Sequence, residues 1–148
     1  MSILEPLISK LTRFNLRSFV VYILEETKSE IEDYQIDQLR FGFDGTGKLI
    51  SPEYRSDEYA AFKKTVLNGQ APLGTPDLKL TGSFQDKIMA RITQQFLEIT
   101  SMDIKTPDLE AKYGEDILKL SDSTFIRYFK DVFLPYAKDE LKLIFNIK

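Results

Sequence analysis

The sequence contains no cysteine and no histidine in its 148 residues. Without these side chains the chain cannot form disulfides, Cys/His zinc sites, thiolate nucleophiles or a histidine-based catalytic triad. General acid–base chemistry would have to come from carboxylates, lysines or tyrosines. These absences exclude a large share of enzyme chemistry, and we expect a non-enzymatic protein with no metal ion and no other cofactor.

A strong charge of one sign is also lacking, since the net charge is −3 and the pI is about 5.1. No global field attracts the chain to nucleic acid or to anionic lipid, so direct nucleic-acid binding is not expected. The apolar run Phe19–Leu24 is far shorter than the ~20 residues that a membrane span needs. Residues 1–15 lack the order of a signal peptide. We therefore expect a protein that matures in a cytoplasm and has no membrane partner.

The chain is rich in apolar and aromatic side chains: 43 % of its residues are hydrophobic, including eleven Phe and seven Tyr. This content and length suit one packed domain over residues 1–148. The changing periodicity predicts an α+β fold, in which a small antiparallel sheet packs against a long C-terminal helix. We expect a helical part over 1–33, strands, a short helix and a hairpin over 36–101, and a helical part over 107–146.

The first 33 residues carry two apolar stripes at helical spacing. The first stripe consists of Leu4, Leu7, Ile8 and Leu11. The second lies along a longer predicted helix that starts at Asn15, a favourable N-cap residue, and continues to about Glu32. Its apolar positions are Leu16, Phe19, Val20, Ile23, Leu24, Thr27 and Ile31.

Two pairs of short strands are predicted in the central part. Alternating Leu39, Phe41 and Phe43 are typical of a half-buried strand, and residues 48–50 would return beside it. A clearer hairpin places Ile88, Ala90 and Ile92 opposite Leu97 and Ile99, with Gln94–Gln95 in the connection. Between these pairs, Ser56 caps a short helix that ends at Gly69, and a proline-containing loop over 68–79 follows.

The last part of the chain is predicted to be helical. Thr106 would cap a compact helix with Pro107 at its first position and Gly114 at its end. A long helix follows Ser121, and Pro135 should kink or split it. The apolar stripe of this long helix consists of Phe125, Phe129, Val132, Phe133, Tyr136, Leu141 and Ile144.

Residues 42–48, "GFDGTGK", have the G-x-x-x-x-G-K spacing of a phosphate-binding loop. Such a loop also needs a Ser or Thr after the lysine and a helix that starts there, but Leu49 follows Lys48 and Pro52 comes soon after. We interpret the stretch as a tight turn in which Asp44, Gly45 and Gly47 adopt turn conformations.

Three segments, "DQLRFGFDGTGKLISPEYRSDEYAAFKK", "GTPDLKLTGSFQDKIMARI" and "LEAKYGEDILKLSD", together resemble a small structural protein of tailed phages and prophages. More remotely, they are similar to the tail-completion and virion-morphogenesis proteins of the head–tail connector. The similarity covers about residues 38–146 and includes Thr81, Gly82, Tyr113 and Gly114 as motif positions. In that group an "L-T-G-x-L" segment opens the first strand, where this chain has Leu80–Phe84.

The resemblance implies a ring subunit at the neck or tail end of a virion, present in the host cytoplasm during assembly. Its partners would be further copies of the chain and neighbouring connector or tail proteins. We expect the subunit contacts on the loop 68–79 and on aromatic residues of the terminal helix. The candidate contact residues there are Phe125, Phe129, Phe133 and Tyr136.

Three other interpretations stay open at this stage: a nucleotide hydrolase, a DNA-associated phage factor, and a toxin–immunity or regulatory adaptor, for which the sequence offers nothing specific. Residues 42–48 would bind a nucleotide if they formed a phosphate loop. A DNA-associated packaging factor would need a continuous basic surface built from Arg13, Arg17, Lys63, Lys64, Arg91 or Lys130. The acidic residues Glu110, Glu115 and Asp116 could bind a hard cation, although scattered carboxylates usually form a solvated face.

Overall fold

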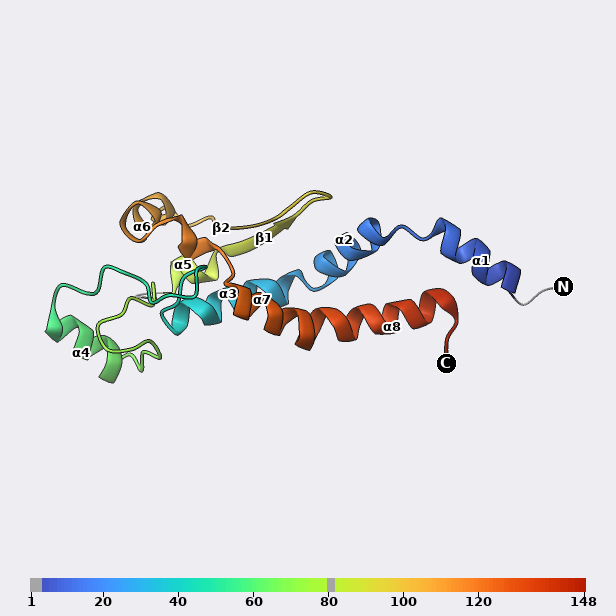
Figure 1. Cartoon of the computed structure of the whole chain (residues 1–148). Coiled ribbons are helices and arrows are strands. Elements are labelled where there is room, and N and C mark those ends of the chain that lie inside the picture. The colour runs from blue at the N-terminus through green and yellow to red at the C-terminus, as the bar shows by residue number, and fades with distance from the viewer. Residues whose placement is uncertain (1–3, 80–81) are drawn as a thin grey trace.

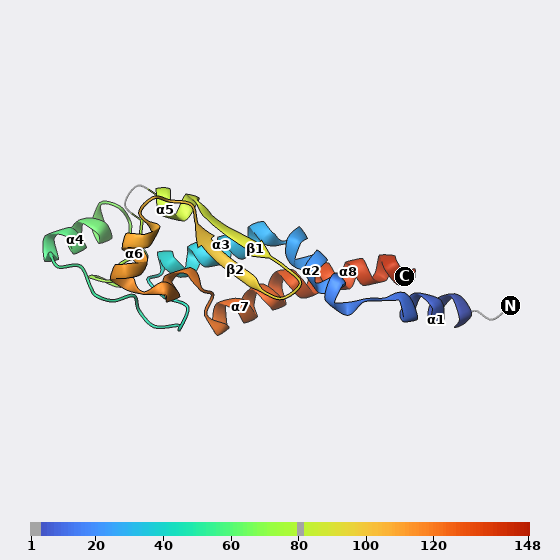
Figure 2. The same cartoon turned by 90° about the horizontal axis from the view of Figure 1, so that it is seen from above.

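The computed structural model describes residues 4–79 and 82–148, which form an elongated array of helices around a short β-hairpin (Figure 1). Helices α2 and α8 lie side by side toward the end that carries both termini, and α4 lies at the opposite end (Figure 2). The predicted α+β class is confirmed. Among the described residues, no helix is long and apolar enough to cross a membrane.

The N-terminal part contains three helices instead of two. Helix α1 spans Leu4–Arg13, and α2 spans Leu16–Glu26 with Asn15 as its N-cap, as predicted. The predicted continuation to Glu32 is wrong, because the backbone leaves the helical conformation at Thr27. The Thr27 hydroxyl donates to the carbonyl of Ile23 and lies 2.6 Å from the Tyr128 hydroxyl. These two contacts keep the junction between α2 and the next helix buried in the core.

Helix α3 spans Lys28–Arg40 and covers the start of the strand predicted at residues 39–43, of which only Phe43 pairs, in an isolated antiparallel bridge with Leu49. The strand prediction is wrong because it treated glutamines as surface residues. Two of them lie on the buried face of this helix. Gln35 donates to the carbonyl of Ile117 at 2.9 Å, and Gln38 donates to that of Lys119 at 2.8 Å. Phe41, on the expected inner face of the strand, is 49 % exposed.

Helix α4 spans Asp57–Thr65, and its predicted N-cap is confirmed, since the Ser56 hydroxyl accepts from the amide of Tyr59. The loop that follows has no helix or strand in its described residues, 66–79. Helix α5, Ser83–Asp86, then leads to the hairpin. The expectation that Leu80–Phe84 opens a strand is wrong at Phe84, which is buried in α5, while Leu80 and Thr81 lie outside the described residues.

The predicted hairpin is confirmed. Strands β1 (Ile88–Ile92) and β2 (Leu97–Ser101) pair antiparallel, with Ala90 opposite Ile99. The outer edge of β1 is bound to α3, because the Glu32 carboxylate accepts from the amide of Ala90 at 2.9 Å. This contact satisfies an edge N–H group that would otherwise be open to pairing with another strand.

Helix α6 spans Thr106–Tyr113 and is followed by the 3₁₀ helix η1, Glu115–Leu118. The predicted cap is one residue off: Thr106 is inside the helix and its hydroxyl donates to the carbonyl of Ser101, while Lys105 occupies the N-cap position. Pro107 therefore stands one position later than expected. Gly114 ends the helix as predicted, with φ +91°.

The C-terminal helical run contains α7 (Asp122–Tyr128), the π-helical turn η2 (Phe129–Phe133) and α8 (Leu134–Phe145). Ser121 caps it, as predicted, by accepting from the amide of Thr124. The disturbance expected at Pro135 takes the form of the π turn just before it, where the Leu134 amide donates to the Phe129 carbonyl. Proline lacks an N–H group and crowds the carbonyl four residues earlier, which a wider turn relieves.

The core has two apolar clusters that meet at Ile99, with α3 in contact with both β1 and α7. The cluster nearer the termini contains Ile23, Ile31, Ala90, Tyr128, Phe133 and Ala137. The other contains Leu39, Ile50, Phe84, Ile88, Ile117 and Leu118. The hairpin thus packs on α3 and, through the first cluster, on the long helix.

Candidate functional site

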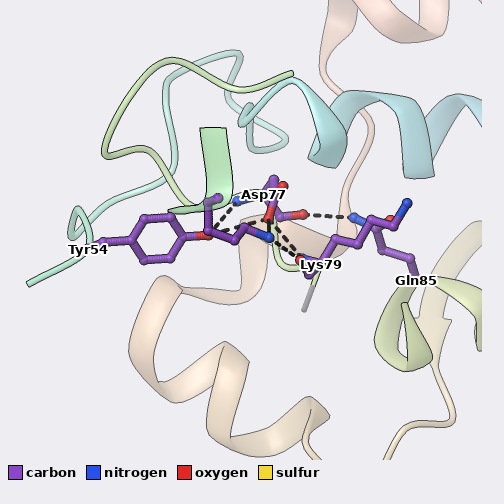
Figure 3. Close-up of polar contacts among 5 residues, drawn as sticks. Tyr54, Asp77, Lys79 and Gln85 are labelled. Carbon is purple, nitrogen blue, oxygen red and sulfur yellow. Dashed lines mark hydrogen bonds and ion pairs between the residues drawn. The ribbon is translucent and has the colours of Figure 1, made fainter. Parts of the chain in front are cut away.

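A buried polar cluster lies between α4, the loop 66–79 and α5, and we call it the Asp77 clamp. It consists of Tyr54, Lys63, Asp77, Lys79 and Gln85. Tyr54 and Gln85 reach Asp77 from segments before and after the loop, and Lys79 lies two residues after Asp77 in the loop itself (Figure 3). Lys63 and Asp77 are each 5 % exposed, and Gln85 is 1 % exposed. The cluster therefore brings a charged pair and an amide side chain into the interior.

Nearly every polar atom of Asp77 has a partner in the clamp. Its carboxylate oxygen Oδ1 lies 2.6 Å from the Lys63 ammonium and accepts from the Tyr54 hydroxyl and from the Lys79 amide. Its backbone carbonyl accepts from the Gln85 side chain at 2.7 Å. Lys63 also donates to the carbonyl of Lys79. These bonds fasten the loop to the helix before it and to the helix after it.

A buried ion pair of this kind is costly to break, because removing one partner leaves an unpaired charge away from water. The same environment acts on Tyr54: burial, and next the nearby Asp77 charge, raise the pKa of this phenol above its ordinary range. Tyr54 is therefore a phenol at neutral pH and acts as a hydrogen-bond donor to Asp77. These contacts give the clamp a structural role: they hold the loop 66–79 against α4 and α5.

A cavity of about 210 Å³ lies beside the clamp. Its walls include Tyr54, Tyr59, Tyr113 and Phe84, and Lys79 and Lys105 also line it. Pockets that enclose small-molecule ligands usually measure roughly 300–1,000 Å³. At about 210 Å³, this cavity is smaller than that range. Tyr113, a motif position of the resemblance, thus lies in the wall, with the Lys112 ammonium 4.9 Å from its ring.

The glycine-rich stretch 42–48 forms a tight turn, as predicted. Phe43 and Leu49 pair as an antiparallel bridge, and the Gly47 amide donates to the Asp44 carbonyl at 3.0 Å. The Asp44 carboxylate accepts from the amides of Thr46 and Lys48. Those amides would have to face a phosphate in a nucleotide-binding loop, but an internal carboxylate already occupies them.

The surroundings of this turn also differ from those of a phosphate loop. After Lys48 the chain passes through the bridge residue Leu49 and irregular backbone, and the next helix, α4, does not begin until Asp57. Gly45 is required by close packing: a Cβ atom there would lie 2.4 Å from the Cβ of Lys119. Its amide donates to the carbonyl of Asp116 at 2.7 Å. The turn is thus a docking point for the segment around η1.

Two other motif positions have conformational roles. Gly47 and Gly82 both have positive φ values, +78° and +87°, in the left-handed region that favours glycine. Gly82 stands directly before α5 and directs the chain into it. Thr81 lies outside the described residues, so its predicted place in the motif stays a prediction.

The candidate contact residues of the terminal helix divide into two groups. Phe125 is 40 % exposed and Phe129 is 36 % exposed, and their rings stack at 6.3 Å. Phe133 is 7 % exposed and belongs to the core, so the accessible part of the predicted interface lies before it. Tyr136 is half-buried and its hydroxyl donates to the Glu26 carboxylate at 3.3 Å.

Several charged residues considered as ligand-site candidates form hydrogen bonds or ion pairs within the chain. Lys63 is in the clamp, and the Lys64 ammonium donates to the carbonyl of Ala71 at 2.9 Å. Arg91 lies 3.6 Å from Glu98, and Asp116 pairs with Lys119. Within the described part of the chain, no group of three or more carboxylates is placed to hold a metal ion.

Sequence reasoning missed the clamp. Lys63 and Lys64 were considered only as basic surface residues, and Asp77 only as part of a turn-forming loop. Pro76 and Asp77 lie inside one of the segments quoted for the resemblance, yet nothing in the spacing joins Asp77 to Lys63.

Comparison of the chain with protein-family models, with curated proteins and with solved structures finds no match in any of the three.

Proposed function

We propose that this protein is a non-enzymatic structural subunit of a tailed-phage or prophage particle, assembling with further copies of itself at the head–tail connector or tail end. The sequence resemblance over residues 38–146 suggests the setting. The observation that supports an assembly role is a set of exposed apolar side chains on α1 and at the end of α8. Both segments lie at the end of the molecule that carries the termini (Figures 1 and 2).

We call the exposed apolar side chains of α1 and of the end of α8 the terminal patch. Every residue of α1 is exposed, including the whole apolar stripe predicted from the sequence. The terminal patch consists of Leu4 (61 % exposed), Leu7 (39 %), Ile8 (55 %), Leu11 (54 %), Leu143 (73 %), Ile144 (39 %) and Ile147 (59 %).

An apolar surface of this kind favours association. Burial of apolar surface contributes roughly 25 cal/mol per Å², and large exposed apolar patches are rare on monomeric proteins. A ten-residue helix such as α1 is also shorter than the roughly 12–15 residues at which isolated helices become marginally stable. The arrangement suits a protein in which α1 is completed by contact with another chain.

The exposed rings of Phe125 and Phe129 supply a second apolar surface, at the start of the C-terminal helical run. Aromatic residues are enriched in protein–protein interfaces because they bury a large area with few rotatable bonds. Two separate surfaces allow one subunit to contact two neighbours, which is what a ring requires.

Multi-angle light scattering on the purified protein tests the assembly role. We expect the mass to rise above the 17.1 kDa of one chain as the concentration increases. A constant monomer mass up to millimolar concentration would count against the proposed function.

The particle setting needs a separate experiment. We expect mass spectrometry of phage particles, induced from a host that carries the gene and purified by density gradient, to detect this chain at a fixed ratio to the portal protein. Its absence from intact particles would contradict the virion location, whatever the light scattering shows.

A further inference from the structure

We propose that a cavity between the glycine-rich turn and the start of α7 binds an aromatic group that carries a single carboxylate. We call this cavity the Phe43 pocket, and its lining includes Phe41, Phe43, Thr124 and Arg127. Its volume is about 470 Å³, within the roughly 300–1,000 Å³ of pockets that enclose small ligands. A free aromatic acid has this chemistry, and so does the last residue of a peptide that ends in phenylalanine. The inference goes beyond the proposed function and does not depend on it.

Two phenylalanine side chains supply the apolar part of the pocket. Phe41 is 49 % exposed and Phe43 is 39 % exposed. Within the described residues, neither ring is paired with another aromatic ring. Aromatic rings attract one another in offset-stacked or edge-to-face arrangements. An aromatic ligand would therefore gain ring contacts here and would cover apolar surface that now faces water.

Arg127 supplies the positive charge of the pocket. Among the described residues that line the cavity, it is the one with a charged side chain. Its guanidinium lies 5.4 Å from the centre of the Tyr34 ring, and it forms no ion pair with any residue that the structure describes. A guanidinium in this state can form charge-assisted hydrogen bonds to a carboxylate.

The charges around the pocket are balanced, which limits the charge of the ligand. The two segments that meet there, 36–49 and 121–133, carry Asp37, Asp44, Asp122 and Asp131 as acids and Arg40, Lys48, Arg127 and Lys130 as bases. Asp37 pairs with Arg40, and the Asp131 carboxylate accepts from the Tyr34 hydroxyl at 3.4 Å. A ligand with one negative charge suits this setting, whereas a phosphate dianion would be repelled by the acids nearby.

Thr124 adds a buried hydrogen-bond donor to the lining. This residue is 6 % exposed, and its hydroxyl accepts from the Ser121 hydroxyl at 2.9 Å. The proton of the Thr124 hydroxyl has no acceptor within the described residues. An ionised carboxylate only accepts hydrogen bonds, so it can satisfy both this hydroxyl and the Arg127 guanidinium. The pocket thus offers two donors and two aromatic rings to one ligand.

Buried contacts hold the walls of the pocket in place. Gln38, near the end of α3, donates to the carbonyl of Lys119 and accepts from the amide of Ser121, both at 2.8 Å. The amide of Gly45 donates to the carbonyl of Asp116 at 2.7 Å and joins the turn to the same segment. A pocket whose walls are already fixed avoids part of the entropy cost of ordering them on binding.

Amide NMR spectra of the full chain, recorded during titration with hydrocinnamate and with a short peptide ending in phenylalanine, locate the binding site. We expect saturable shifts at residues 41–48 and 121–127. Phe96, an exposed phenylalanine at the hairpin turn, is the internal control and should not shift. The same peptide with an amidated C-terminus should bind about three- to fivefold more weakly, because it lacks the charge that pairs with an exposed cation.

Substitutions in the pocket test the role of each group. Arg127→Gln should weaken binding of the acid peptide by the same factor and leave binding of the amidated peptide unchanged, because both changes remove one interaction. Phe43→Ala should weaken both peptides. The matched controls are Lys130→Gln and Phe96→Ala, which alter exposed positions outside the pocket and should have no effect.

Each outcome decides the inference. Shifts confined to the pocket, with a preference for the acid that Arg127→Gln removes, support it. Saturation by the peptide alone assigns the ligand to a polypeptide C-terminus, and saturation by hydrocinnamate alone assigns it to a small molecule. No saturation up to about 10 mM, shifts centred elsewhere, or equal affinity for acid and amide overturns it. The map on the unaltered chain decides this even if a variant fails to fold.

Discussion

The two ends of this elongated molecule differ in how far their side chains are buried. At the α4 end, Lys63 and Asp77 are each 5 % exposed and are enclosed by hydrogen bonds within the same chain. At the α1 end, the apolar side chains of the terminal patch are exposed, and Leu143 is 73 % exposed. One end encloses charged side chains within the chain, and the other leaves apolar side chains exposed to solvent.

This difference indicates where stability and assembly reside. Loops without regular structure are normally mobile, but the loop 66–79 is fixed through buried polar bonds. A short helix without buried residues has no comparable internal support. Substitutions at the two ends should therefore act on different quantities: the free energy of unfolding at the clamp, and the association constant at the terminal patch.

The largest effect is expected from Asp77→Ala. This change leaves the Lys63 ammonium buried and unpaired, so it should lower the free energy of unfolding by about 3–5 kcal/mol. Urea denaturation of the dilute protein measures it, with Glu58→Ala, an exposed acidic position on α4, as the control. A loss below 1 kcal/mol would show that the clamp does not hold this end together.

The paired substitution Lys63→Met with Asp77→Leu separates charge burial from packing. It removes both charges, so it should lose clearly less stability than Asp77→Ala alone. Equal losses would mean that the hydrogen bonds of Tyr54 and Lys79, and not the unpaired charge, dominate.

Gly45→Ala should have the next largest effect, about 1–3 kcal/mol from overpacking. The added methyl group would lie within 3 Å of the Lys119 Cβ and of the carbonyl oxygens of Lys119 and Asp116, two of which belong to the backbone. Gly47→Ala is the comparison within the same turn, because its added atom has only a contact at 3.9 Å and the cost is limited to its positive φ. Thermal denaturation should rank Gly45→Ala as the more damaging change.

Alkaline pH should weaken the closed end through Tyr54, whose pKa is raised in the folded protein by burial and by Asp77. In the unfolded chain tyrosine ionises near pH 10. The contribution of the protonated phenol is therefore complete below about pH 10 and is lost as pH rises toward the folded pKa. We expect Tyr54→Phe to flatten the decline of stability above pH 10, and an unchanged slope would contradict this assignment.

The smallest effect on folding is expected at the terminal patch. Leu7→Asp with Leu11→Asp should change the free energy of unfolding of the dilute monomer by no more than about 0.5 kcal/mol, since both side chains are exposed. The same variant should lose its mass increase in light scattering. A large loss of monomer stability would mean that α1 is covered within its own chain.

Much of the fold follows from local patterns in the sequence. The caps at Asn15, Ser56 and Ser121, the hairpin from Ile88 to Ser101 and the end of α6 at Gly114 all come from short-range chemistry. The error at residues 39–43 arose because Gln35 and Gln38 appear polar in the sequence. Their burial is decided by carbonyls about eighty residues later, which no local pattern encodes.

The candidate site was predictable only in part. The turn at 42–48 was recognisable because Asp, Gly and a following extended segment have local preferences. The clamp was not, because the pairing of Lys63 with Asp77 depends on how a loop without periodicity folds back on α4. The apolar stripe of α1 was visible in the sequence, but only the structure shows that it stays exposed among the described residues.

Amide hydrogen exchange at several protein concentrations tests the contrast between the two ends most directly. Protection of α1 should increase steeply with concentration as a second copy covers it, while the amides around Asp77 should be equally protected throughout. Exchange in α1 that is independent of concentration, whether fast or slow, would contradict the account that a second copy completes this end.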